Sequence, residues 1–128
     1  MRIVATIEAR MTSTRLPGKV MLQVLGKPML HYLVERLKKV PSIDEIILAT
    51  TVNSDDDILV EFAKEENIKY FRGSEEDVML RVVEAADSVG ADIVVEITGD
   101  CPIIDPQIVE QTVLMYKANN ADYVSNGH

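Results

Sequence analysis

Apolar residues along this chain alternate between continuous runs and segments in which they recur every three or four positions. Buried β-strands are predicted near residues 2–7, 45–50, 69–72 and 92–97, and residues 122–125 are a candidate fifth strand. The segments between the strands predict amphipathic helices. Strands and helices in alternation predict a parallel sheet with helices on both faces, and all strands end at one edge of it.

Four helices are predicted from the spacing of their apolar residues. The first begins after Pro28 and stops before Pro41. Ser54 and Ser74 are the expected N-caps of the second and third helices, and Pro106 opens the fourth. The residues expected to face inward are Met29, Leu30, Leu33, Val34, Leu37 and Val40 in the first, Ile58, Leu59, Phe62 and Ala63 in the second, Val78, Met79, Val82, Val83, Ala86 and Val89 in the third, and Ile108, Val109, Val113 and Tyr116 in the fourth.

Length and composition limit the classes of protein to consider. At 128 residues, of which 47% are hydrophobic, residues 1–128 are expected to form one domain with a substantial core. The net charge of −8 argues against a nucleic-acid partner. The single cysteine, Cys101, excludes an internal disulfide and fits a reducing cytoplasm. No membrane-spanning run and no signal peptide are evident, so we expect a cytoplasmic protein without a membrane partner.

A polar segment without helical or alternating period follows the first strand and carries three cations, Arg10, Arg15 and Lys19. These residues suit a polyphosphate. Arginine gives paired hydrogen bonds to phosphate oxygens, lysine adds a positive charge, and the turn at Pro17-Gly18 lets backbone N–H groups approach the anion. An irregular surface loop with solvated charges is the alternative. The segment has neither the G-x-G-x-x-G pattern of dinucleotide-binding folds nor the spacing of a Walker A loop.

Acidic residues near two strand ends are candidate metal ligands. Asp100 follows the fourth strand, where a carboxylate can hold Mg²⁺ or can cap its own turn. Asp55, Asp56 and Asp57 crowd the expected first turn of the second helix, which favours capping over a metal site. Ligands of parallel sheets bind beyond the carboxyl ends of the strands, so we expect the site at that edge.

The letters A-R-x-x-S-T-R-L-P-G-K after the first strand, and G-K-P-M before a helix, resemble the cytidylyltransferases that activate acidic sugars. This family includes the CMP-KDO and CMP-acylneuraminate synthetases, and the chain looks closest to the spore coat polysaccharide biosynthesis protein F type. The resemblance runs from Arg2 to about Asn126 and covers only the N-terminal half of the family's enzymes. It implies a Rossmann-like three-layer α/β/α fold of the nucleotide-diphospho-sugar transferase type, with a mostly parallel sheet.

Site residues follow from the resemblance, position by position. The x-G-D-x-P pattern implies that Asp100 holds the metal, and Thr98, two residues earlier, stands where related synthetases often have a Gln that recognises cytosine. Asp77 and Arg81 occupy the first and last positions of the family's S-G-T-x-R segment. The implied catalytic residues are Arg10, Arg15 and Lys19, and the implied nucleotide-binding residues are Ala9, Arg10, Ser13, Arg15, Lys19, Asp77, Arg81 and Thr98.

The sequence departs from the family at several points. Glu8 stands where Gln is expected and Thr12 where Gly is expected, and the family's second metal carboxylate lies beyond His128. Arg81 has an alternative role as a solvated helix residue.

The activity implied is Mg²⁺-dependent transfer of CMP from CTP to an acidic sugar for surface or spore coat polysaccharide, with release of pyrophosphate. The implied partners are CTP and a sugar, and the resemblance allows a homodimer. Three alternatives stay open: a GTP- or UTP-dependent nucleotidyltransferase, whose glycine-rich loop is absent here; a glycosyltransferase of related fold, whose D-x-D spelling occurs at residues 55–57; and a non-catalytic or truncated nucleotide-binding module.

Overall fold

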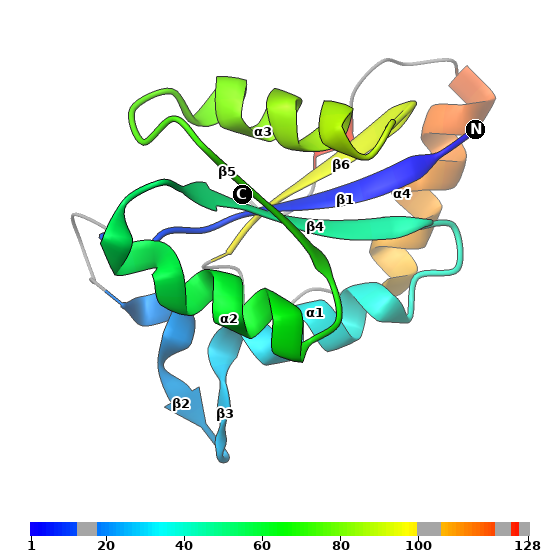
Figure 1. Ribbon diagram of the computed structural model, residues 1–128. Helices are drawn as coiled ribbons and strands as arrows, with labels where there is room; N and C mark the ends of the chain where they lie inside the picture. The colour runs from blue at the N-terminus through cyan, green and yellow to red at the C-terminus, as the bar shows by residue number, and fades with distance from the viewer. Residues whose placement is uncertain (13–17, 100–105, 120–123, 126–128) are drawn as a thin grey trace.

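A computed structural model describes residues 1–12, 18–99, 106–119 and 124–125 of the chain. Its centre is a five-stranded parallel sheet with strand order β5-β4-β1-β6-β7 (Figure 1). The predicted strands and their shared direction are confirmed, and the fifth strand is short. The strands are β1 (Ile3–Glu8), β4 (Glu45–Thr51), β5 (Lys69–Gly73), β6 (Ile93–Thr98) and β7 (Val124–Ser125).

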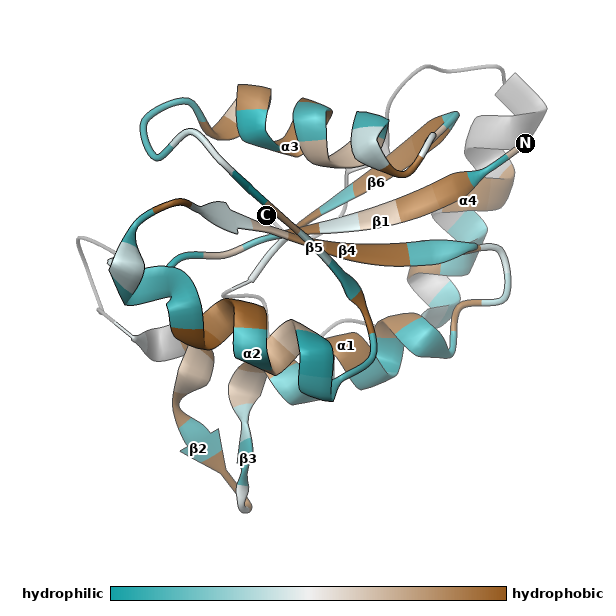
Figure 2. Cartoon of the chain, in the orientation of Figure 1, coloured by the Kyte–Doolittle hydropathy of each residue, from teal (hydrophilic) through white to brown (hydrophobic). Residues whose placement is uncertain are grey.

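The middle strand β1 is apolar because it is covered on both faces of the sheet. Ile7 pairs with Leu48 of β4 on one side and with Ile97 of β6 on the other. Much of β1, β4 and β6 has the brown colour of hydrophobic residues, interrupted by short paler or hydrophilic stretches (Figure 2). Because the strands are parallel, the segments that leave β1, β4 and β6 emerge at the same edge of the sheet.

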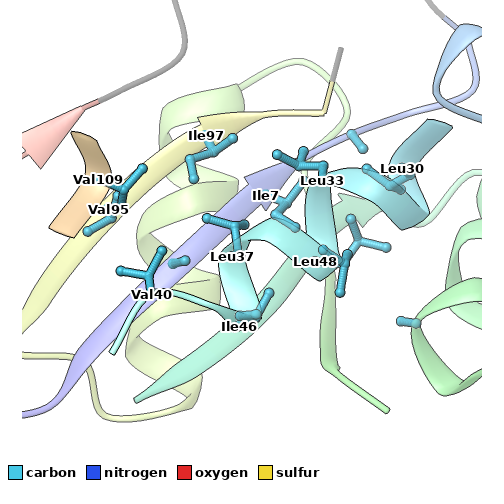
Figure 3. Packing of buried hydrophobic residues seen from close by; sticks show 14 of the residues in the cluster. Ile7, Leu30, Leu33, Leu37, Val40, Ile46, Leu48, Val95, Ile97 and Val109 are labelled. Carbon is cyan, nitrogen blue, oxygen red and sulfur yellow. The ribbon is translucent and has the colours of Figure 1, made fainter. Parts of the chain in front are cut away.

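Helices cover both faces of the sheet, as the strand–helix alternation predicts. α1, α2 and α4 share one core with the sheet, in which Leu33 and Leu37 pack near Ile7 and Ile97 (Figure 3). α3 lies on the opposite face, where Ala85 packs in a smaller cluster of buried residues (Figure 1). The helices are α1 (Met29–Lys38), α2 (Asp57–Glu65), α3 (Val78–Ser88) and α4 (Pro106–Asn119). None of the described helices is both long and apolar enough to cross a membrane.

The first helix has the bounds that its sequence predicts and, except for the half-buried Met29, the predicted inner stripe. Pro28 is its N-cap with an extended backbone, and α1 ends at Lys38, before Pro41. Proline is tolerated at a helix start because the missing N–H has no helical partner there. The buried residues of this stripe are Leu30, Leu33, Val34 and Leu37 within the helix, and Val40 just after it.

The expected caps of α2 and α3 are wrong. Asn53, not Ser54, caps the short 3₁₀ helix η2 (Ser54–Asp56) before α2, through a side-chain oxygen 2.8 Å from the Asp55 amide nitrogen. Asp77 caps α3 and accepts from the Leu80 amide at 2.9 Å. Serine, asparagine and aspartate all serve as caps, so composition alone does not choose between neighbouring candidates.

The inner stripe expected for α3 is also wrong in part. Val82 and Ala86 are buried as predicted, but Val78, Met79 and Val83 are exposed. Arg81 and Ala85 take the buried positions instead. The most apolar face of this helix points outward, while alanines face the sheet. In α2 the prediction also fails at Ile58, which is exposed, while Val60 is buried. In α4, Val109 and Val113 are buried as predicted, and the side chains of Ile108 and Tyr116 lie outside the described part.

A hairpin between the first loop and α1 was not predicted. β2 (Gln23–Val24) pairs antiparallel with β3 (Lys27–Pro28) and extends away from the sheet (Figure 1). Leu25 and Gly26 connect the strands with φ values of 52° and 84°. Two consecutive residues at positive φ are typical of the tight turns that join two-residue hairpins. Ahead of the hairpin lies the 3₁₀ helix η1 (Lys19–Met21).

Candidate functional site

The carboxyl ends of β1 and β6 approach closely. The amide of Gly99 donates to the carbonyl of Glu8 at 2.6 Å, and Glu8 pairs in register with Thr98. A Cβ on Gly99 would lie 2.8 Å from the Cβ of Ala9 and 3.0 Å from the Glu8 carbonyl oxygen, which is closer than side-chain carbons pack. Glycine therefore lets the chain segments leaving β1 and β6 begin side by side.

Arg10 is the described cation at this junction. It follows β1 by two residues, is half-buried, and makes no ion pair or hydrogen bond with the described part of the chain. Ala9 before it is buried and extends the pairing of β1 with β4, because its amide donates to the Ala49 carbonyl at 3.2 Å. Arg10 thus carries a charge without a partner in the described part of the chain, on a backbone that the sheet holds in place.

The other cations predicted for this loop are described only partly. Ser13 and Arg15 lie outside the described residues, and so does Asp100, the predicted metal ligand. Lys19 begins η1, but its side chain is outside the described part. Their predicted roles stay predictions.

The two described ends of the cationic loop are joined to each other. The amide of Gly18 donates to the carbonyl of Met11 at 2.8 Å, and Gly18 has a φ of +75°. A residue other than glycine is strained at that φ. The Gly18 carbonyl then accepts from the amide of Met21 at 3.0 Å, which connects the loop to η1. This hydrogen bond between residues 11 and 18 therefore holds the two ends of the intervening segment together.

Asp56, the last residue of η2, binds the backbone of Met11 with its side chain instead of capping α2. It is fully buried; its Oδ1 accepts from the Met11 amide at 2.7 Å and its Oδ2 accepts from the Thr51 hydroxyl. Its neighbour Asp57 pairs with Arg72 at 2.9 Å. Within the part of the chain that the structure describes, no cluster of three acidic, histidine or cysteine side chains could hold a metal ion.

Arg81 is buried, so its reading as a solvated helix residue is wrong. Its side chain is 0% exposed; one terminal nitrogen lies 2.6 Å from Glu8 Oε1 and the other donates to the Ser74 carbonyl at 2.7 Å. A Cβ on Gly73 would lie 3.3 Å from the Arg81 Cγ, so glycine makes room for the Arg81 stem. Arg81 thereby ties α3 to the end of β1, two residues before Arg10.

The predicted nucleotide-binding residues therefore gather in part at one edge of the sheet. Ala9, Arg10 and Thr98 lie at the paired ends of β1 and β6, and Arg81 reaches the same edge from α3. Asp77 lies one helical turn before Arg81 and is exposed, with one carboxylate oxygen engaged in its cap. No described contact assigns Asp77 a further role.

Two contacts at this edge were not predicted from the sequence. They are the hydrogen bond of Asp56 to the Met11 amide and the ion pair of Glu8 with Arg81. A signal for Asp56 was present in its spacing, since it precedes the buried residues Leu59, Val60 and Ala63 by three, four and seven positions. A polar residue in phase with a buried stripe needs a hydrogen-bond partner, and here the partner comes from the loop after β1. For Glu8 no comparable periodic signal exists, because it lies at the strand end.

Residues 4–128 match the sequence model of the cytidylyltransferase family. The spore coat polysaccharide biosynthesis protein SpsF of Bacillus subtilis is 34% identical over 125 residues, which are 94% of this chain and 52% of that protein. The chain spans about half the length of the curated relatives it matches.

Two solved structures share the fold. A cytidylyltransferase from Leptospira borgpetersenii superposes with a TM-score of 0.90 at 38% identity, covering 94% of this chain and 51% of that one. A CMP:2-keto-3-deoxy-manno-octonic acid synthetase, solved in complex with CTP, superposes with a TM-score of 0.79 at 32% identity, covering 94% and 49%. These neighbours confirm the Rossmann-like nucleotidyltransferase fold. With the family match over nearly its whole length, the chain belongs to the cytidylyltransferase family.

Proposed function

We propose that this chain provides the CTP-binding half of an enzyme that transfers CMP from CTP to a sugar. The observation that carries the proposal is the guanidinium of Arg10, which has no ion-pair partner among the described residues, at the joined ends of β1 and β6 in a chain of the cytidylyltransferase family. A free cation at the carboxyl edge of a parallel sheet suits a nucleotide phosphate. The related synthetase solved with CTP supports this choice of nucleotide.

The proposed reaction is an in-line displacement at the α-phosphate. A sugar hydroxyl loses its proton to solvent while its oxygen forms a bond to the α-phosphorus, the bond from that phosphorus to the bridging oxygen breaks, and pyrophosphate leaves with the electron pair. Arg10, Arg15 and Lys19 would neutralise the charge that builds on the leaving group, and Ser13 would add a hydrogen bond. Catalysis of this kind rests on positioning and charge stabilisation, so no nucleophilic side chain is required.

Mg²⁺ is the proposed cofactor, and the available donor suits it. Asp100 offers the carboxylate oxygen that this ion prefers, and it directly follows Gly99, whose amide is fixed on the Glu8 carbonyl. When bound, Mg²⁺ would supply Lewis-acid stabilisation of the phosphate oxygens. Asp56 is a poor alternative ligand, because both of its oxygens already accept hydrogen bonds. A glycosyltransferase D-x-D at residues 55–57 would use Asp55 and Asp57, and Asp57 is already paired with Arg72 at 2.9 Å, which argues against it.

Thr98, Asp77 and Arg81 are the candidates for contact with the nucleoside, and all three lie near the carboxyl edge or at the start of α3. An acidic sugar destined for surface or spore coat polysaccharide is supported by the names of the Bacillus relative and of the synthetase. Because the chain spans about half of its relatives, a nucleotide-binding module without catalysis of its own is the second candidate.

An activity assay separates these two candidates. Release of pyrophosphate from CTP and Mg²⁺ is measured at high protein concentration with a panel of acidic sugars, with and without the separately expressed C-terminal half of a relative. Sugar-dependent release in either arm supports the transferase. Binding of CTP without release in both arms supports the module, and equal release from CTP, GTP and UTP contradicts a cytidylyltransferase.

A further inference from the structure

Asp56 is the one carboxylate that is fully buried among the described residues. It occupies the N-cap position of α2 but makes no capping hydrogen bond with its side chain. A buried charge is costly unless hydrogen bonds replace the lost water. Both oxygens are in fact engaged, by the Thr51 hydroxyl and by the Met11 amide, 45 residues away in sequence. The second of these partners belongs to the loop that carries Arg10.

Met11 is thereby held at both of its backbone polar groups. Its N–H donates to Asp56 Oδ1 at 2.7 Å, and its carbonyl accepts from the Gly18 amide at 2.8 Å. Arg10 precedes this fixed residue, and Gly18 begins the turn into η1. The place where the start of α2 meets the segment leaving β1 can be followed in Figure 1. One carboxylate therefore fixes the described start and end of the cationic loop.

The turn that carries Asp56 is held by hydrogen bonds that connect the ends of β4 and β5. Arg72 of β5 donates from Nε to the Thr51 carbonyl at 2.7 Å and from a terminal nitrogen to the Asn53 carbonyl at 2.8 Å. The same guanidinium pairs with Asp57 at 2.9 Å. These bonds fix the short turn between β4 and α2 on which Asp56 lies. A carboxylate on a fixed turn can in turn fix the loop that it binds.

We propose that Asp56 is a positioning residue for polyphosphate binding. It orients the Met11 backbone, and through it Arg10 and Gly18, without touching the nucleotide. The inference rests on the proposed function, because it takes the cationic loop as the polyphosphate site. Charge supports a positional role: a negative side chain behind a polyphosphate site weakens binding by electrostatics, so its contribution must come from geometry.

Three variants distinguish an effect of loop positioning on binding from an effect of the Asp56 charge and from a general loss of stability. Asp56→Ala removes both hydrogen bonds. Asp56→Asn removes the charge but keeps an oxygen that can accept from the Met11 amide. Asp44→Ala is the matched control, because Asp44 Oδ2 also accepts from a backbone amide of β1, that of Ile3 at 2.8 Å, but at the opposite end of the strand.

The test is titration calorimetry of each folded variant with CTP and with tripolyphosphate, without metal, together with hydrogen exchange at the Met11 amide. Asp56→Ala should weaken binding of both ligands by about tenfold and expose the Met11 amide to exchange, as expected for the loss of one strong hydrogen bond that orders the loop. Asp56→Asn should bind within about threefold of the unmodified protein, and Asp44→Ala should bind equally well. Unchanged affinity in Asp56→Ala, or equal losses in Asp44→Ala, would overturn the inference.

Two further outcomes distinguish this inference from the proposed function. Tight binding of tripolyphosphate without preference for CTP would contradict the cytidylyltransferase proposal, and the Asp56 comparison would still decide the inference. If the unmodified protein binds neither ligand, both fail. Should Asp56→Ala not fold, Thr51→Val replaces it, because it removes the hydroxyl that holds the other oxygen of Asp56. Unchanged affinity and unchanged Met11 exchange in Thr51→Val would then overturn the inference.

Discussion

For the ion pair between Glu8 and Arg81 we predict that removing Glu8 destabilises the protein more than removing Arg81. Arg81 is 0% exposed and Glu8 is 18% exposed, and their side chains approach to 2.6 Å. Glu8→Ala leaves a buried guanidinium with the Ser74 carbonyl as its remaining described partner. An uncompensated buried charge typically costs about 3–5 kcal/mol, so we expect a loss of that size in the free energy of unfolding.

Removal of the Arg81 guanidinium should lower the free energy of unfolding by less than removal of the Glu8 carboxylate. Arg81→Met keeps an unbranched stem against Gly73 and leaves Glu8, which can turn its carboxylate toward water. The expected loss is about 1.5–3 kcal/mol, the value of a hydrogen bond to a charged group. Met at this position also removes Nε, which is buried without a hydrogen-bond partner in the described part of the protein. Glu8→Gln keeps an acceptor and should cost about 1 kcal/mol.

Urea unfolding followed by circular dichroism measures these differences. The double variant Glu8→Ala/Arg81→Met should be less destabilised than the sum of its single variants, by about 1–3 kcal/mol, because the charge left alone in one single variant is absent. Additive losses, or a Glu8→Ala loss smaller than that of Arg81→Met, would refute the reasoning. The pair would then be solvated in solution, and α3 would be held to β1 by other contacts.

The remaining predictions concern the loop and the strand ends. Gly99→Ala should lower the free energy of unfolding by about 1–3 kcal/mol in urea, since its Cβ would meet Ala9; an unchanged value contradicts the close approach. Arg15→Ala and Lys19→Ala should weaken metal-free CTP binding by roughly ten- to a hundredfold in calorimetry. Asp100→Asn should keep metal-free binding and lose the increment due to Mg²⁺; unfolding with that increment retained would make Asp100 structural. Leu25→Asn should stabilise the protein by about 0.5–1 kcal/mol in thermal unfolding, because Leu25 has a φ of 52°.

The elements predictable from the sequence are those whose signal is local. Continuous apolar runs placed β1, β4 and β6, and the α1 stripe between two prolines placed that helix. The expected stripe of α3 failed because the prediction followed the most apolar residues, whereas small alanines and Arg81 face the sheet. Helix faces are chosen by what they pack against, and that is a property of the assembled sheet.

The contacts that build the site depend on residues far apart in the chain. Arg81 and Glu8 are separated by 73 positions, and Asp56 and Met11 by 45. No feature of a single sequence indicates that the two residues of either pair are in contact. The cationic segment can be recognised in the sequence, because Arg10 and its neighbours follow a recognisable strand and form a long motif, and its binding role stays a prediction. Residues that hold a site in place are therefore harder to predict than residues whose local motif suggests a ligand contact.

The central claim is that the edge formed by β1 and β6 binds CTP. Isothermal titration of the unmodified chain with CTP, UTP, ATP and GTP, each with Mg²⁺, tests it most directly. We predict that CTP binds more tightly than ATP or GTP, and that Arg10→Ala, which removes the uncommitted cation, weakens binding of all four nucleotides. Equal affinities for the four triphosphates, or CTP affinity that Arg10→Ala leaves unchanged, would contradict the account.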